Sequence, residues 1–287
     1  MTDTIDIVIP SAGRPAELLT LLQALGCGAD PAAAGVASIT VSDDRHSAAL
    51  ASRLRAHWPA VQYRAGPARG PAANRNHAAT RGRAAWLLFL DDDCIPAAGL
   101  VAHYRAAMAA QPQIGVFQGA ILPLGPRPDA GHHAPINQHG GDLVTCNFAI
   151  RRDLFERLGG FDERFPHSLE DCDLDARMDH DGVAVAFAPA AAVNHPWRRP
   201  TVAELQRQIL GHAIMADKHP AFVSDWTLID LLRKMRGRLR QYGSGNLAPV
   251  PPRYWGLAAL DFSMPLATHA TVRLAPLRRA ILRRHAR

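Results

Sequence analysis

Short strand-like runs alternate with amphipathic segments along the first third of the chain. Strands are expected over residues 5–9, 39–41, 61–64 and 86–90, and helices over 18–25, 46–58, 71–80 and 96–110. Most of the strand-like runs are therefore followed by a helical one. This order predicts an α/β fold in which helices flank a mostly parallel central sheet.

A polar stretch rich in glycine and proline, residues 125–141, interrupts this pattern and predicts a mobile loop. After it, strands are expected over 143–150 and 183–187, and helices over 152–158, 170–179 and 201–217. The last of these helices has a clear start signal, because Thr201 and Glu204 have the spacing of a capping box.

The tail from residue 221 combines leucines with many basic residues. Leu231, Leu232, Met235 and Leu239 lie among Arg233, Lys234, Arg236, Arg238 and Arg240, and four more arginines follow at 278, 279, 283 and 284. The pattern predicts a basic helical C-terminal extension. Two interpretations stay open, a helical cap on the main domain and peripheral attachment to an anionic bilayer.

Composition narrows the class of protein. The 287 residues are 48% hydrophobic and 20% charged, which is typical of a globular chain and excludes disorder. The net charge of +6 favours anionic partners. With only 6% aromatic residues and no stacking face of arginines and aromatics, nucleic acid is not expected.

Several features bear on location. The four cysteines form no CxxC pair, so neither a zinc site nor a disulfide framework is indicated, and a reducing cytoplasm fits best. No signal peptide and no apolar run of spanning length are recognised. The expected location is the cytoplasm, including the inner face of the membrane if the basic tail attaches there.

Three consecutive carboxylates, Asp91, Asp92 and Asp93, follow the apolar run 86–90. Ligands of open α/β sheets bind at the carboxyl ends of the strands, where this triplet is expected to lie. Adjacent negative charges repel unless a cation offsets them, and hard carboxylate oxygens suit Mg²⁺ or Mn²⁺. A solvated acidic turn is the alternative, although the apolar strand ahead of it argues against that interpretation. Asp43 and Asp44 end a strand in the same way, and there a plain turn is the alternative.

Five short motifs occur in an order that resembles glycosyltransferase family 2. They are Ile7-Val8-Ile9-Pro10, Asp43-Asp44, Gly70 to Asn76, Asp91 to Asp93, and Gly160-Phe161-Asp162-Glu163 leading to Glu170-Asp171. The resemblance covers roughly residues 5–215 and implies a GT-A fold. It divides the chain into a nucleotide-sugar-binding half (1–110), an acceptor-binding and catalytic half (111–220) and the basic helical extension (221–287).

The resemblance also implies an activity, the metal-dependent, inverting transfer of a sugar from a nucleoside diphosphate donor to a hydroxyl acceptor. UDP is the favoured nucleotide, because a carboxylate such as Asp43 suits the imide N–H of uracil. The implied nucleotide contacts are Pro10, Asp43, Asp44, Arg75, Asp91 and Asp92. The implied ligands of Mn²⁺ or Mg²⁺ are Asp91, Asp93 and His195, of which the imidazole favours manganese.

Catalysis is assigned by the same resemblance to the Glu170-Asp171 pair, with Asp171 as the general base. A helix N-terminus favours an ionised carboxylate at this point. Since acidic residues also occur there for stability alone, the surrounding Gly160-Phe161-Asp162-Glu163 context carries the assignment.

Two other functions compete. A nucleotidyltransferase that forms nucleotide-sugars has a related fold, and residues 11–15, Ser-Ala-Gly-Arg-Pro, resemble its glycine-rich opening but lack the full Gly-x-Gly-x-Arg and the following lysine. Such an enzyme would release pyrophosphate. A non-catalytic sugar- or nucleic-acid-binding protein is the second alternative, for which the set of acidic motifs would have no purpose.

Overall fold

The computed structural model describes residues 4–26, 35–141, 143–165, 168–224, 226–243 and 247–285. The chain forms two compact units. The first comprises Met1–Leu124, Pro135–Glu163 and Asp171–Pro196, and the second comprises Gly125–Ala134, Arg164–Glu170 and Trp197–Arg287. The functional halves expected at 1–110 and 111–220 stay a prediction.

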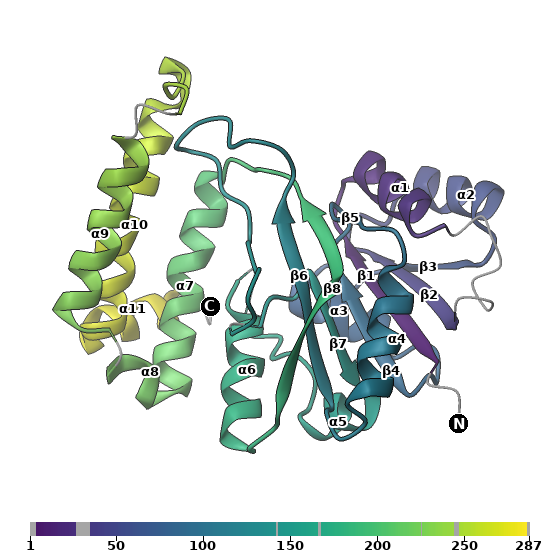
Figure 1. The fold of residues 1–287 in the computed structure, drawn as a ribbon. Helices are drawn as coiled ribbons and strands as arrows, with labels where there is room; N and C mark the ends of the chain where they lie inside the picture. Colours follow the sequence, from purple (N-terminus) through teal and green to yellow (C-terminus); the bar gives the residue numbers. More distant parts are fainter. Residues whose placement is uncertain are drawn as a thin grey trace. The chain divides into compact units, whose positions relative to one another are not determined.

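An eight-stranded sheet forms the centre of the first unit (Figure 1). The strands are β1 (Ile5–Ser11), β2 (Val36–Asp43), β3 (Val61–Ala65), β4 (Trp86–Leu90), β5 (Ile95–Pro96), β6 (Val116–Pro123), β7 (Asn147–Arg151) and β8 (Val185–His195), in the order β3-β2-β1-β4-β7-β6-β8-β5. β1 to β4 are mutually parallel, β7 runs antiparallel to both β4 and β6, and β8 is parallel to β6. The α/β prediction is confirmed: the first four strands build a continuous parallel part of the sheet, and β6 and β8 form a further parallel pair.

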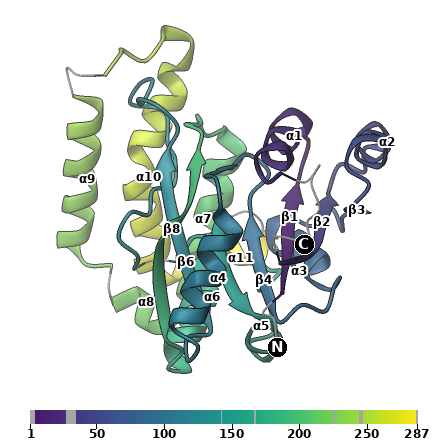
Figure 2. The same ribbon diagram turned by 45° about the vertical axis from the view of Figure 1, so that its right-hand side comes forward.

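Helices cover both faces of this sheet. The core on one face includes α1 (Pro15–Ala24), α2 (Ala48–His57) and α4 (Leu100–Ala110), and Figure 2 shows α4 crossing that face. The core on the other face includes α3 (Pro71–Ala79), α5 (Arg152–Arg157) and α6 (Glu170–His180). Strand β4 is apolar throughout because its alternate side chains enter both cores. Its buried end therefore delivers the following carboxylates to the sheet edge.

The described part of the second unit is mainly helical. It contains α7 (Val202–Lys218), α8 (Pro220–Ser224), α9 (Leu228–Tyr242), the 3-10 turn η2 (Pro252–Tyr254), α10 (Trp255–Arg273) and α11 (Ala275–His285). The capping box at the start of α7 is confirmed by both of its hydrogen bonds. The helical extension is confirmed as well. None of the described helices has the length and apolar content that crossing a bilayer requires.

The segment predicted as a loop, 125–141, is irregular but well anchored where it enters each unit. In the second unit, Asp129 accepts a hydrogen bond from the Gly131 amide and forms an ion pair with Arg199. His133 pairs with Arg198 through two backbone hydrogen bonds. In the first unit, Asn137 pairs in the same way with Ile121 of β6. The mobility of this segment stays a prediction.

Candidate active site

The three carboxylates after β4 are paired with arginines. Arg14 forms ion pairs with Asp92 and Asp93, at 2.6 Å from Nη2 to Oδ1 and 2.8 Å from Nη1 to Oδ2. Arg75 lies 2.7 Å from Oδ1 of Asp91. Asp92 is fully buried and Asp93 is 4% exposed. The alternative of a solvated acidic turn is therefore excluded, because two of the three carboxylates are shielded from water.

Burial makes the negative charge of this cluster costly. It raises the pKa of Asp92 to about 7, although Arg14 opposes this shift, and Asp93 adds to the shift by repulsion. Burial acts in the same direction on Asp91, but the charge and hydrogen bond of Arg75 outweigh it and lower the pKa of that carboxyl. Three carboxylates thus share two guanidinium groups, which leaves room in the charge balance for a further cation.

His195 ends β8 and lies beside Asp93. Its Nε2 atom is 3.4 Å from Oδ1 of Asp93, and its Nδ1 atom is 2.9 Å from the carbonyl oxygen of Pro196. A carbonyl only accepts hydrogen bonds, so Nδ1 donates to it, and Nε2 is the ring nitrogen directed towards Asp93. A metal ion at this point would bind the Nε2 atom and the carboxylate oxygen together. This donor set, one imidazole nitrogen and carboxylate oxygens, fits Mn²⁺ or Mg²⁺.

Cys94 is the third side chain near this pair. Its sulfur and the donor atoms of Asp93 and His195 lie within 4.8 Å of one another. The thiol contacts the carbonyl oxygen of Cys146 at 3.6 Å, and the hydrogen bond with Cys146, together with burial, raises its pKa well above the usual value. A protonated thiol is a poor metal ligand, so Asp93 and His195 are the better candidates.

Arg14 is the site residue that the sequence analysis missed. It directly precedes α1 and follows Gly13, whose φ of 83° lies in the left-handed region. Because β1 and β4 are parallel neighbours, the segment after β1 and the triplet after β4 emerge at the same edge of the sheet. An arginine three residues beyond the first strand was the signal that could have identified it.

The Asp43-Asp44 pair has structural roles that a single strand pattern does not reveal. Asp43 is buried, and its carboxylate accepts hydrogen bonds from the amides of Arg45 and Ser47 and from the Tyr63 hydroxyl. Asp44 is half-buried and accepts a hydrogen bond from the Ala68 amide at 2.9 Å. Burial raises the pKa of Asp44 despite this bond. Asp44 is thus the more accessible carboxylate, and contact with a nucleotide base stays a prediction for both.

Arg75 and its neighbour on α3 are buried. The Arg75 guanidinium lies 5.8 Å from the centre of the Phe161 ring, so Asp91 and this ring fix its position. The side-chain amide of Asn74 donates to the carbonyl oxygens of Ser11 and Ser42, which joins α3 to the ends of β1 and β2. Pro10, the remaining predicted nucleotide contact, is buried within β1.

Glu170 and Asp171 begin α6, as predicted. Asp171 is half-buried and its Oδ1 accepts a hydrogen bond from the Cys172 amide at 2.9 Å. Glu170 is 4% exposed. The residue before the pair, Leu169, has a φ of 70°, a conformation that costs a side chain of this size about 1–3 kcal/mol. Such strain is maintained only where the surrounding structure imposes it, and it often marks functional segments.

Comparison with protein families assigns the chain to a family of enzymes. The model of glycosyl transferase family 2 matches residues 7–159, a segment that contains the Asp43-Asp44 pair, Arg75 and the Asp91–Asp93 triplet. Because the match covers more than half of the 287 residues, the chain belongs to glycosyltransferase family 2.

A curated relative is similar to part of the chain. It is an N-acetylglucosaminyl-diphospho-decaprenol L-rhamnosyltransferase of Mycobacterium tuberculosis (strain CDC 1551 / Oshkosh), 32% identical over 110 residues, or 37% of this chain and 34% of that protein. The match thus spans about a third of the length of that relative.

Solved structures establish the fold. The mannosyltransferase PcManGT from Pyrobaculum calidifontis, in complex with GDP-Man and Mn²⁺, aligns with a TM-score of 0.54 at 14% identity, over 98% of this chain and 74% of that one. TarS 1-349 of S. aureus in complex with UDP-GlcNAc aligns with a TM-score of 0.58 at 14% identity, over 99% of this chain and 87% of that one. The predicted GT-A fold is confirmed, and the family membership replaces both competing functions considered from the sequence.

Proposed function

We propose that the chain is a metal-dependent, inverting glycosyltransferase that moves a sugar from a nucleoside diphosphate donor, with UDP favoured, to a hydroxyl acceptor. One observation carries the proposal: Asp92, Asp93 and His195 form a buried, anion-rich cluster at the carboxyl edge of the sheet, where Nε2 of His195 faces a carboxylate oxygen at 3.4 Å. A shielded surplus of negative charge beside an imidazole nitrogen has the chemistry of a cation site.

In this proposal, different residues bind the metal ion and the nucleotide of the donor. Asp91, Asp93 and His195 would hold Mn²⁺ or Mg²⁺, which when bound neutralises the charge that develops on the departing diphosphate. Arg75 fixes the orientation of Asp91 through their ion pair at 2.7 Å. Asp44, more accessible than Asp43, is the better candidate to accept the imide N–H of uracil. Pro10 and Asp92, the other two residues proposed to contact the nucleotide, are both buried.

Asp171 would act on the acceptor. A general base must be ionised and reachable, and Asp171 is half-buried in the first turn of α6, where the free amides of the helix start favour its charge. It would take the proton of the acceptor hydroxyl as that oxygen attacks the anomeric carbon from the face opposite the diphosphate. The bond to the diphosphate oxygen breaks with inversion, and the buried Glu170 is the second carboxylate of the proposed catalytic pair.

Two observations support a lipid-linked acceptor, the name of a similar protein and the charge of the C-terminal helices. The similar mycobacterial protein is named for a decaprenol-linked acceptor. Residues 221–287 contain 12 of the 32 basic residues but 3 of the 26 acidic ones, a net charge of +9, so the rest of the chain is at −3. Helix α9 exposes Leu228, Leu232 and Leu239, each by 60% or more. Exposed leucines on a basic helix suit peripheral attachment to an anionic bilayer.

Calorimetric titration tests the donor site. UDP, GDP, dTDP and ADP would be titrated into the full chain with Mn²⁺ and again with a chelator. We expect one nucleotide, UDP, to bind in the presence of Mn²⁺ and to lose at least tenfold in affinity with the chelator and in Asp93→Ala. Binding that ignores both the metal and Asp93 would contradict the proposed site.

A substitution separates the base from the donor site. Asp171→Asn should reduce transfer at least a thousandfold, because an amide cannot take the acceptor proton, while metal-dependent UDP affinity stays within about twofold. The control is Asp179→Asn, an exposed carboxylate on the same helix, which should leave transfer unchanged. Transfer that persists in Asp171→Asn would assign the base elsewhere.

A further inference from the structure

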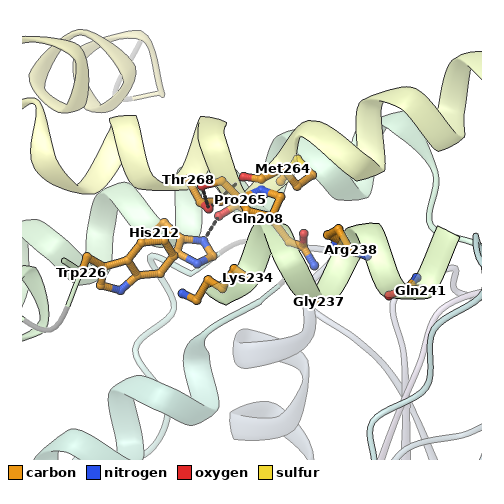
Figure 3. Close-up of a pocket in the computed structure, with 10 residues that line it drawn as sticks. All are labelled: Gln208, His212, Trp226, Lys234, Gly237, Arg238, Gln241, Met264, Pro265 and Thr268. Atoms are coloured by element: carbon orange, nitrogen blue, oxygen red, sulfur yellow. Dashed lines mark hydrogen bonds between the residues drawn. The ribbon is translucent and has the colours of Figure 1, made fainter. Parts of the chain in front are cut away.

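A pocket of about 340 Å³ lies within the second unit, among α7, α9 and α10 (Figure 3). Trp226, in the short segment before α9, completes its wall. Its walls are formed by Gln208, His212, Trp226, Lys234, Gly237, Arg238, Gln241, Met264, Pro265 and Thr268. This volume suits the polar head of a small molecule. None of the groups placed in the donor site or in catalysis lines it.

The charge of this pocket is positive. Lys234 and Arg238 both line it from α9, and none of its lining residues is acidic. Arg238 forms an ion pair at 3.0 Å with Asp261 of α10, so Lys234 is the cation whose charge is not compensated. Lys234 lies with Nζ 3.3 Å from the centre of the Trp226 ring, and no carboxylate in the described ranges is within ion-pair distance of it. His212 contributes no charge, because burial lowers its pKa to about 4 and its Nδ1 atom hydrogen-bonds the Gln208 carbonyl oxygen. The pocket therefore favours an anion.

One wall of the pocket is apolar. The Trp226 side chain is 7% exposed and packs against Phe222, with their ring centres 5.7 Å apart. Met264 and Pro265 of α10 extend this wall. An aromatic ring, a thioether and a proline ring bind hydrocarbon, whereas two cations bind phosphate. The combination fits a phosphate that carries an apolar chain.

Helix α9 relates this pocket to a bilayer. At 100° per residue, the pocket-lining positions 234, 237, 238 and 241 cluster on one side of the helix, and the exposed Leu228, Leu232 and Leu239 cluster on the opposite side. Interfacial helices bury their apolar face by about 5–10 Å, and a helix with its side chains is about 10 Å across. With the leucines at the acyl boundary, the pocket side of α9 lies at the depth of lipid phosphates.

We infer that this pocket binds the phosphate of a membrane amphiphile, with Lys234 and Arg238 on the phosphate and Trp226 on the first part of the hydrocarbon chain. Two sources share that chemistry, an anionic phospholipid headgroup and the phosphate of a lipid-linked acceptor. The second source rests on the proposed transfer to a lipid-linked hydroxyl. Binding is measured without donor or metal, so a failure of binding and a failure of the proposed transfer are distinguishable.

The first experiment titrates geranylgeranyl diphosphate into the full chain in the presence of a chelator, which prevents metal-dependent binding at the donor site. Geranylgeraniol and inorganic diphosphate serve as probes that lack the phosphate and the chain, respectively. We expect both to bind at least tenfold more weakly than geranylgeranyl diphosphate. Lys234→Gln should weaken binding of geranylgeranyl diphosphate at least tenfold, and Arg233→Gln, the same charge change at an exposed neighbouring position, by less than twofold.

A pocket-filling variant guards against loss of fold. Gly237→Leu adds a side chain at a position where nothing lies within 4 Å of the new Cβ atom, so it should block the pocket and leave α9 intact by circular dichroism. We expect it to abolish binding of geranylgeranyl diphosphate. Binding that survives both Gly237→Leu and Lys234→Gln would overturn the inference.

Vesicles separate the two sources. Partition to phosphatidylcholine vesicles with 30% phosphatidylglycerol, as a chosen composition, would be compared for Lys234→Gln and Arg233→Gln. A larger loss for Lys234→Gln supports a phospholipid headgroup in the pocket, and equal losses with weakened geranylgeranyl diphosphate binding support the lipid-linked acceptor. If the two variants do not differ with either probe, Lys234 acts only as diffuse surface charge and the inference is wrong.

Discussion

At the scale of single residues, the main feature of the molecule is the pairing of arginines with three adjacent carboxylates that follow a buried strand. Arg14 compensates the two that are most shielded, and Arg75 compensates the third. Arg14 is also the more accessible of the two arginines, with 32% of its side chain exposed. A metal ion bound at the cluster would therefore compete with the Arg14 guanidinium for the same negative charge.

Removing Arg14 should uncover that competition. In Arg14→Gln, two buried carboxylates lose their counter-ion, which should lower the free energy of unfolding by about 2–3 kcal/mol, below the usual cost of breaking a buried pair because Arg14 is partly solvated. The Tm would be measured with chelator and with Mn²⁺. We expect Mn²⁺ to raise Tm more in Arg14→Gln than in the natural chain, since the cation then meets uncompensated charge.

The control for this measurement is Arg53→Gln, which removes an exposed arginine of α2. Its Tm and its response to Mn²⁺ should match those of the natural chain within about 1 °C. A Mn²⁺ response of Arg14→Gln that is no larger than that of Arg53→Gln would show that Arg14 and the cation do not share these carboxylates.

At the scale of elements, contacts between segments distant in sequence explain strand β6 and helix α10, which the local sequence pattern does not define. Strand β6 was not predicted, because Gly119 interrupts its apolar run; a Cβ atom there would clash with the Ala191 carbonyl of β8 and the Tyr104 hydroxyl. Helix α10 lies within the predicted helical extension, but its bounds were not predicted, and it continues through Pro265, a residue that usually breaks a helix. Its packing against α7 and α9 supports the helix across the proline.

What could be predicted was local. The strand ends, the acidic triplet and the capping box of α7 follow from neighbouring residues, and the two residues Asp93 and His195, each predicted as a metal ligand, lie 3.4 Å apart. What could not be predicted depends on distant partners: the reach of Arg14 to the triplet, the hydrogen bonds that occupy Asp43, and the face of α9 that points outward. Periodicity reveals that a helix is amphipathic but not which face meets the protein.

Gly211 of α7 provides a test at this scale. Alanine in a helix interior usually stabilises by about 1 kcal/mol relative to glycine. At Gly211, however, the new Cβ atom would lie 2.8 Å from the Ser168 carbonyl oxygen, directly before the strained Leu169. We expect Gly211→Ala to destabilise by about 1–3 kcal/mol in urea unfolding. Because the displaced turn leads into α6, kcat should fall about tenfold or more.

Gly237 of α9 is the matched control. It also lies inside a helix, but nothing is within 4 Å of the position of its Cβ atom, so Gly237→Ala should stabilise by up to about 1 kcal/mol. If Gly211→Ala were equally stabilising and fully active, close contact between α7 and the segment before Glu170 would not constrain the turn.

At the scale of the whole molecule, the second unit is joined by a buried carboxylate. Asp261 of α10 accepts a hydrogen bond from the Tyr242 hydroxyl at 2.7 Å and pairs with His133 and Arg238, each at 3.0 Å. It thereby connects α10 to α9 and to the segment 125–134. Burial alone would raise the pKa of Asp261, but the hydrogen bonds from His133 and Tyr242 and the charge of Arg238 hold it below the usual value.

This shift has a defined consequence for stability. A carboxyl whose pKa is lower in the folded chain stabilises it above the unfolded pKa of about 3.9, and the contribution disappears as pH falls through the lower, folded value. The difference in unfolding free energy between the natural chain and Asp261→Asn should therefore be about 2–4 kcal/mol at pH 6 to 7 and shrink steadily below pH 4. Urea unfolding followed by tryptophan fluorescence measures this difference, since Trp197, Trp226 and Trp255 all belong to the second unit.

Asp217→Asn, at an exposed position on α7, provides the comparison and should leave the unfolding free energy nearly unchanged across this pH range. A difference for Asp261→Asn that stays constant down to pH 3 would mean that the contacts of Asp261 do not favour its ionised form, and that packing rather than charge joins α9 to α10.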